Sequence, residues 1–403
     1  MNNETHIEAN TSTEASTTTR KTRDIGPEIL RIISMFLIVC VHFLNYGGVI
    51  NHANSAGELF ALRGLYSFFT VSVNVFVLIS GYFLVKSNFK LKKVIALWLQ
   101  VFFFTTTSYI ICGLFIDHDF SIRYLFFKCF FPLLQQRYWF FTAYIVLYLI
   151  FPLLNKILNN CSRKECWYIL IGVFVLSYLS NRFPIDNVIN IRTGYNVLWF
   201  ICLYFVGAIL RLHPPKFKKW VVLLVYLACI FLVWANFYYK PTYWGYKYFV
   251  NTPDYTSPLV LLGSIALFLL FNNIRSDNKV LTRIINIISS TTFGIFLFDG
   301  CSLKNWFYFD LFKITKYHGH YLSVLYVLLF SLCMFVCGMI YDFIRQLIFK
   351  LSTKTYNKIK EKRQLWGCLF YICLPPKFLS NLLASWRCFS LCGVCGTILS
   401  ISS

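Results

Sequence analysis

Apolar stretches of about 20 residues recur along almost the whole of this 403-residue chain. A helix of about 20 mainly apolar residues is long enough to cross the ~30 Å hydrocarbon core of a bilayer. The sequence therefore predicts an all-α polytopic membrane protein, with ten spans of which the fifth and the ninth are the shorter or interrupted ones. The spans cover roughly residues 27–46, 64–85, 94–116, 138–155, 166–181, 196–211, 219–238, 257–273, 287–303 and 321–348.

The scarcity of charge excludes the soluble and the disordered classes. Charged residues make up 13% of the chain and apolar residues 58%, with a mean hydropathy of +0.61. A soluble globular protein carries about 25% charged residues, so this chain has only about half of the charged residues that a water-exposed surface needs. A disordered chain would be poor in apolar residues instead. A bilayer is the partner that this composition requires.

The charges that are present are distributed unequally between the loops. The net charge is +22, and with the N-terminus inside, the cytoplasmic segments carry 24 Lys and Arg against 11 in the outer loops. This excess is what the positive-inside rule demands, so we predict both termini to be cytoplasmic in a multi-pass cell-membrane protein. Nucleic acid is not an expected partner, because no long basic stripe with interleaved aromatic residues lies outside the apolar segments.

Three parts of the chain differ in composition. Residues 1–24 are polar and predict a disordered cytoplasmic tail, residues 25–350 form the transmembrane domain, and residues 351–403 form a Cys-rich cytoplasmic tail. Within the last part, residues 366–403 fit either a membrane-surface segment or a poorly structured end, and no function is assigned to them. Their cysteines have no zinc-like spacing, so we expect no metal site.

The first span carries two ionisable residues on one face. Arg31 and His42 are eleven residues apart, which at 100° per residue places them within 20° of the same azimuth and about 16.5 Å apart along the helix. Histidine suits proton transfer near neutral pH, and arginine suits the binding of phosphate or carboxylate. Two simpler interpretations stay open. Arg31 would then extend to lipid headgroups, and His42 would be an interfacial histidine.

Other polar residues have both a structural and a functional interpretation. Ser80-Gly81 in the second span favours close helix packing, with a ligand contact as the alternative. The loop with Lys86, Lys90, Lys92 and Lys93 is explained by topology and anionic lipid, or by a phosphate-binding rim beside Arg31.

Two acids are candidates to face His42. Asp299 ends an apolar stretch, where it either caps a helix or faces His42 across a polar cavity. Glu58 is expected in the first outer loop, and the simpler interpretation is that its side chain is exposed to solvent there.

The arrangement of these residues resembles the acyltransferase-3 family of integral membrane acyltransferases. Arg31, ten residues and His42 are similar to the Arg-x10-His signature of that family. Three further stretches resemble the branch that modifies bacterial cell-surface polysaccharides: residues 74–84 with Ser-Gly-Tyr, residues 138–155 ending in Pro-Leu-Leu-Asn, and residues 291–299. The resemblance covers about residues 27–350.

This resemblance implies transfer of an acyl group, usually acetyl, from acyl-CoA on the cytoplasmic side to a sugar hydroxyl on the outer face. The acceptor would belong to a surface polysaccharide or a glycolipid, and acetyl-CoA would be the donor, with no permanently bound cofactor. His42 and Arg31 occupy the positions that the family treats as essential. One departure concerns Asp299, because relatives commonly carry His at that position.

The residues and the resemblance together predict a mechanism. Arg31, with Lys90, Lys92 and Lys93 as a rim, would bind the phosphates of acyl-CoA and leave the thioester near His42. His42 would act as a general base or accept the acyl group itself, with Asp299 or Glu58 orienting its ring. Two other functions stay open: a transporter or flippase for a polar or lipid-linked glycan, and a non-catalytic partner in a surface-assembly complex.

Overall fold

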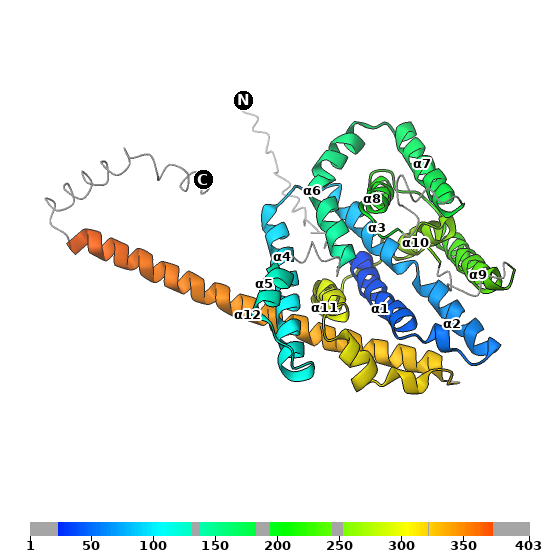
Figure 1. Cartoon of the computed structure of the whole chain (residues 1–403). Helices are drawn as coiled ribbons and strands as arrows, with labels where there is room; N and C mark the ends of the chain where they lie inside the picture. Colours follow the sequence, from blue (N-terminus) through cyan, green and yellow to red (C-terminus); the bar gives the residue numbers. More distant parts are fainter. Residues whose placement is uncertain (1–22, 131–137, 183–193, 244–252, 321, 374–403) are drawn as a thin grey trace, which may run out of the picture. The chain divides into compact units, whose positions relative to one another are not determined.

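The computed structural model describes residues 23–130, 138–182, 194–243, 253–320 and 322–373, almost all of them helical (Figure 1). The chain divides into two compact units, residues 1–342 and 343–403, and the site described below lies in the first. The helices are α1 Gly26–Tyr46, α2 Ala56–Phe69, α3 Ser72–Leu84, α4 Leu91–Ile111, α5 Ile122–Phe130, α6 Trp139–Asn160, α7 Arg163–Arg182, α8 Val197–Leu212, α9 Lys219–Tyr243, α10 Pro258–Phe271, α11 Lys279–Asp299 and α12 Ser323–Cys373. Short 3-10 turns cover Ile50–His52 and Ile314–Tyr317, π-helical turns cover Cys112–Ile116 and Trp306–Leu311, and the strands β1 Arg23–Asp24 and β2 Arg275–Ser276 pair antiparallel.

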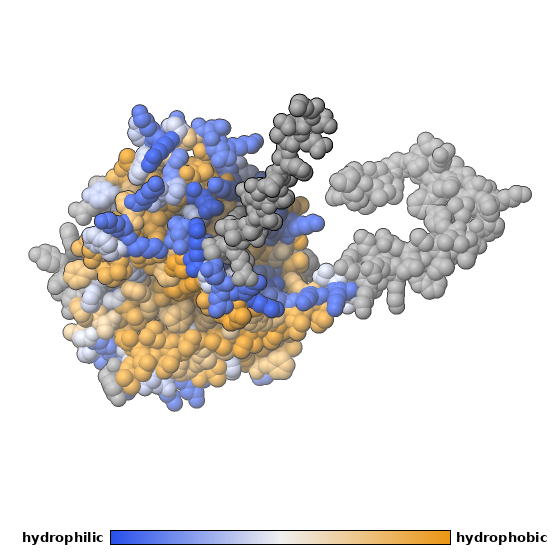
Figure 2. Space-filling view, turned by 180° about the vertical axis from the view of Figure 1, so that it is seen from behind, coloured by the Kyte–Doolittle hydropathy of each residue, from blue (hydrophilic) through white to orange (hydrophobic). Residues whose placement is uncertain are grey.

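The predicted class, an all-α polytopic membrane protein, is confirmed. Within the described part of the chain, seven helical stretches are long and apolar enough to cross a membrane, and α8 and α10 are shorter apolar helices. Helix α7 covers the predicted fifth span but is not among these seven stretches or the two shorter apolar helices. On the face shown in Figure 2, apolar residues form a broad band and hydrophilic residues gather at its edges.

Some predicted boundaries are wrong. The structure places Glu58 and Arg63 in α2 rather than in an outer loop, and Arg63 is buried. Helix α11 begins at Lys279, eight residues before the predicted span, and α12 continues well past residue 348. Arg23 and Asp24 form a short strand, while the rest of the predicted N-terminal tail and residues 374–403 lie outside the described residues.

Helix α1 packs against α2, α3, α10 and α11. Its start is fixed, because the backbone amides of Ile25 and Gly26 both donate to the carbonyl of Ile274, at 2.9 and 3.2 Å. A Cβ atom at Gly26 would lie 1.8 Å from the carbonyl oxygen of Phe271, so only glycine fits at this crossing. Pro27, in the first turn, has the φ angle that a helix start requires. These contacts set the position of α1, which carries Arg31 and His42.

Small residues bring α3 and α8 into close contact. A Cβ atom at Gly81 would lie 2.5 Å from the carbonyl oxygen of Tyr204, and one at Gly207 would lie 2.3 Å from that of Leu78. Small residues at a helix interface let two backbones approach in this way. The Ser80-Gly81 pair therefore serves helix packing, the simpler of its two interpretations.

Candidate active site

His42 contacts Asp299 across the interface between α1 and α11. His42 Nδ1 is hydrogen-bonded to Asp299 Oδ2, although the two residues are 257 positions apart in the sequence. The side chain of Asp299 is fully buried, and that of His42 is 19% exposed. A carboxylate oxygen can only accept a hydrogen bond, so we assign the ring proton to Nδ1 as the donor to Asp299. The lone pair of Nε2 is then the available base.

Tyr308 holds the other oxygen of the same carboxylate. Its hydroxyl donates to Asp299 Oδ1 at 3.0 Å from the π-helical turn that follows α11, and its side chain is fully buried. Burial, and then the nearby charge of Asp299, raise the pKa of Tyr308 well above its usual range, so the phenol stays a protonated donor. We call His42, Asp299 and Tyr308 the histidine cluster.

Two cavities meet at the histidine cluster. The first, the aromatic cavity, is narrow, with a volume of about 30 Å³ between α1, α3, α6 and α11, and Tyr195 and Tyr255 also line it. The second, the loop cavity, has a volume of about 260 Å³, and residues that follow α11 form one side of it. Both cavities share the side chains of His42, Tyr46, Trp139 and Phe296. A reacting group at His42 is therefore open to ligands from two sides.

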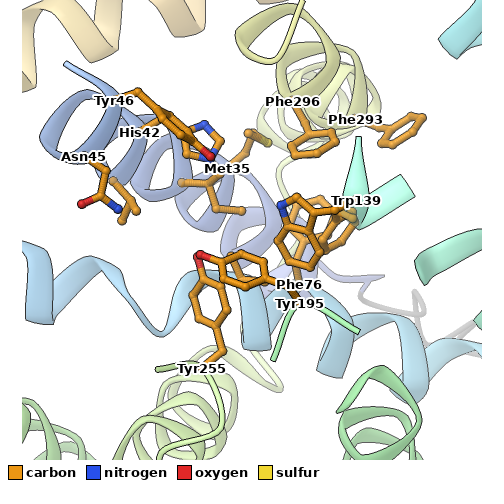
Figure 3. Close-up of a pocket in the computed structure, with 14 residues that line it drawn as sticks. Met35, His42, Asn45, Tyr46, Phe76, Trp139, Tyr195, Tyr255, Phe293 and Phe296 are labelled. Carbon is orange, nitrogen blue, oxygen red and sulfur yellow. The ribbon is translucent and has the colours of Figure 1, made fainter. Parts of the chain in front are cut away.

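Aromatic rings surround His42 on the side of the aromatic cavity. Figure 3 shows His42 and Tyr46 on α1, with Trp139, Phe296 and Tyr255 around the same space. The ring of Trp139 packs edge-on against Tyr195, with centroids 4.5 Å apart. Burial raises the pKa of Tyr195 and Tyr255, two loop residues, so both stay neutral. This wall suits an uncharged, largely apolar group.

Arg31 lies in a second polar cluster near the start of α1. Its Nη1 atom donates to Glu28 Oε2 at 2.6 Å and to Ser289 Oγ on α11 at 3.4 Å. Ser289 Oγ also donates to Glu28 Oε2. The side chains of Arg31 and Glu28 are 26% and 22% exposed. We call these three residues the arginine cluster.

The two clusters lie on one pair of parallel helices. Arg31 pairs with Ser289, and His42, eleven residues later on α1, pairs with Asp299, ten residues later on α11. At 1.5 Å per residue, the two clusters are about 15–16.5 Å apart along the helix axes. The face of α1 that carries Arg31 and His42 therefore contacts a polar side chain of α11 at both positions.

Glu58 and the lysines of the basic loop lie elsewhere. The Glu58 carboxylate accepts from the backbone amide of Asn54 at 2.9 Å, and its own amide donates to Ser55 Oγ at 3.1 Å, which is a helix-capping arrangement. Asp299, and not Glu58, contacts His42. The remaining predicted binding residues have exposed side chains at the start of α4: Lys90, Lys92 and Lys93.

The other predicted motifs contribute mainly to structure. Asn74 donates to the carbonyl of Tyr255 at 2.8 Å and accepts from the Trp199 indole at 3.1 Å, which fixes one wall of the aromatic cavity. Asn155 donates to the carbonyl of Leu84 at 3.0 Å and so gives a hydrogen-bond donor to a carbonyl at the C-terminal end of α3. A Cβ atom at Gly294 would lie 2.3 Å from the carboxyl group of Asp342, so glycine is needed there.

Three residues near His42 and Arg31 are not among those predicted from the sequence. Tyr308 and Lys304 follow α11 in an irregular segment that has no helical periodicity to point toward His42. Ser289 lies on the predicted ninth span, ten residues before Asp299, and at 100° per residue the two lie about 80° apart around the helix, so the helical period does not link them.

A multi-pass membrane fold with a His–Asp pair that lines two cavities fits a membrane enzyme that holds a base between two ligands. The family model described as an acyltransferase domain, that of the acyltransferase-3 family, matches residues 24–354. This match covers most of the chain, so the chain belongs to the family and is a membrane acyltransferase. No curated protein and no solved structure matches it.

Proposed function

We propose that the protein transfers an acetyl group from acetyl-CoA on the cytoplasmic side to a hydroxyl group of a surface polysaccharide or glycolipid on the outer side. It would do so in the plasma membrane, with both termini in the cytoplasm. The observation that carries the proposal is the position of His42, hydrogen-bonded to buried Asp299 and accessible from two cavities at once. A two-substrate transfer needs such a position, because donor and acceptor must meet at one base.

His42 Nε2 is the general base in this proposal. It takes the proton of the acceptor hydroxyl while the hydroxyl oxygen attacks the thioester carbonyl carbon. The carbon–sulfur bond breaks, and the proton passes from the imidazolium to the sulfur of CoA, so the products are an oxygen ester and free thiol. Asp299 fixes the tautomer and stabilises the imidazolium. Attack by His42 itself, with an acyl-imidazole intermediate, uses the same contacts and remains the alternative order of steps.

Arg31 is the proposed site for the phosphates of the donor. A guanidinium forms paired hydrogen bonds with phosphate oxygens, and that of Arg31 is partly exposed. The 15–16.5 Å between the two clusters is of the order of the length of the pantetheine arm, which would reach the thioester to His42. On the predicted topology, Lys90, Lys92 and Lys93 also face the cytoplasm, where they would add positive potential as a diffuse rim.

The test is mass spectrometry of the surface glycan from cells that lack the gene and carry wild type, His42→Ala or His118→Asn. His118 is a matched control, because it is exposed and has a positive φ angle that asparagine tolerates. All variants must reach the membrane in equal amounts. We expect the mass of an acetyl ester with wild type and His118→Asn, and a loss of about 10³-fold in transfer for His42→Ala. Glycans with identical esters in all strains would refute the proposal.

A further inference from the structure

Lys304 lies at the loop cavity, close to the proposed base. Its Nζ atom lies 3.8 Å from the centroid of the Tyr46 ring, and the His42 ring centroid is 5.2 Å from the same point. The ammonium group and the imidazole centre are therefore no more than about 9 Å apart. Contact with the ring of Tyr46 restrains the flexible lysine side chain within reach of the cavity.

The lining of the loop cavity is suited to a charged sugar. Among the described residues that line it, Lys304 is the one lysine or arginine, and Ser302 and Asn305 add hydrogen-bonding groups. Trp139 supplies an apolar ring surface of the kind that packs on the carbon face of a pyranose. The carboxylate of Asp299 is fully buried and accepts from His42 and Tyr308, whereas the side chain of Lys304 is partly exposed.

The distance between Lys304 and His42 restricts where the acceptor can carry its own charge. An acceptor that lies between them uses a hydrogen bond of about 2.8 Å at each end. At most about 3–4 Å then remain between its reacting hydroxyl and its anionic oxygen, because about 9 Å is the upper limit of the distance from the ammonium group to the imidazole centre. Such a short separation places both groups on one sugar unit.

Building on the proposed function, we propose that the acceptor is an anionic saccharide whose carboxylate or phosphate binds Lys304 while a hydroxyl of the same unit faces His42. Lys304 is then a specificity-determining residue for the acceptor and has no part in donor binding. The interaction adds only to the affinity for charged acceptors, because an ammonium group offers a neutral sugar far less electrostatic attraction.

The test uses the full-length protein in nanodiscs with acetyl-CoA and three matched oligosaccharides: a uronate, its neutral methyl ester, and a phosphorylated analogue. The measured quantity is kcat/KM for each anionic acceptor divided by that for the neutral one. For wild type we expect a ratio of about ten or more with either the uronate or the phosphorylated analogue. The acceptor that gives this ratio shows which anionic group is recognised. The ratio should fall with increasing salt, because an exposed charge pair is screened.

Three variants show whether Lys304 causes the preference. In Lys304→Gln the ratio should fall to near one, in Lys304→Arg it should stay within about threefold of wild type, and in Lys313→Gln, an exposed control in the same segment, it should not change. A wild-type ratio near one, or a ratio unaltered by Lys304→Gln, would overturn this inference alone. Failure of wild type to acetylate any acceptor would instead refute the proposed function on which it rests.

Discussion

The arginine cluster and the histidine cluster lie on the same two helices, yet they are built differently. Arg31 pairs with Glu28, three residues away on its own helix, and both side chains are more than one-fifth exposed. His42 pairs with Asp299 from a distant helix, and Asp299 and Tyr308 are fully buried. A partly hydrated pair on one helix is weakly held and exchanges partners readily. A buried carboxylate that accepts from two side chains is held rigidly.

The comparison therefore separates two tasks. The arginine cluster is suited to reversible binding, because a phosphate can replace the carboxylate of Glu28 at little cost. The histidine cluster is suited to holding a base in a single orientation while protons move. Substitutions in the histidine cluster should lower kcat, and substitutions in the arginine cluster should raise KM for the donor.

Replacement of Asp299 should have the largest effect after that of His42. Asp299→Asn keeps the shape of the side chain but removes the negative charge that fixes the tautomer of His42. We expect kcat to fall by about 100-fold or more, with KM for acetyl-CoA changed less than threefold. Steady-state acetyl transfer by the protein in nanodiscs gives both constants.

Asp342→Asn is the matched control for this experiment. Asp342 is also a fully buried carboxylate, and it accepts from Gln100 at 3.0 Å in the packing between α4 and α12. Its substitution should leave kcat within a few-fold of wild type, because it has no contact with His42 among the described residues. Equal losses of kcat in the two variants would contradict a specific role for Asp299.

Replacement of Arg31 by lysine should have the next largest effect and should act on donor binding. Arg31→Lys keeps the charge but removes the planar fork that binds two phosphate oxygens. We expect KM for acetyl-CoA to rise about tenfold, with kcat at saturating donor reduced less than threefold. Arg283→Lys, at an exposed position of α11, should leave both constants unchanged. An unaltered KM in Arg31→Lys would mean that Arg31 does not bind the donor.

The two clusters also differ in how much of them could be predicted from the sequence. The helical period alone puts Arg31 and His42 on one face, because both lie on a single regular helix. The helical period of α1 cannot predict which acid contacts His42, because that contact joins two helices that are far apart in the sequence.

The errors in the prediction have local causes. Tyr308 follows α11 in a π-helical turn, where no regular spacing relates it to Asp299. Glu58 lies in α2 and not in the predicted loop, and small and charged residues interrupt the apolar pattern at the start of this helix. The spacing of Ser55 and Glu58 is that of a capping box, and this signal would have placed the start of α2 correctly.

Removal of the Tyr308 hydroxyl should have a smaller effect on the histidine cluster. Tyr308→Phe leaves Asp299 in contact with His42 but removes one of its two donors. A net loss of about 0.5–1.5 kcal/mol predicts a decrease in kcat of roughly 2–10-fold. Because the pKa of Tyr308 is raised, its phenol stays protonated where free tyrosine ionises, near pH ~10. The ratio of wild-type to Tyr308→Phe activity should therefore stay constant up to that pH, and a ratio that falls to one below it would contradict this role.

The smallest expected effect distinguishes the two candidate acids. Glu58→Ala removes the acceptor of the Asn54 amide at the start of α2, where capping groups are worth about 0.5–1 kcal/mol. We expect the melting temperature to decrease by a few degrees and kcat per folded molecule to stay within twofold, measured on the same nanodisc samples. Glu58→Gln, which keeps an acceptor oxygen, should recover most of the lost stability.

A loss of kcat in Glu58→Ala as large as that in Asp299→Asn would show that α2 supplies the acid that acts on His42. Because Asp299 contacts His42 in the structure and Glu58 does not, we expect the two effects to differ by well over tenfold.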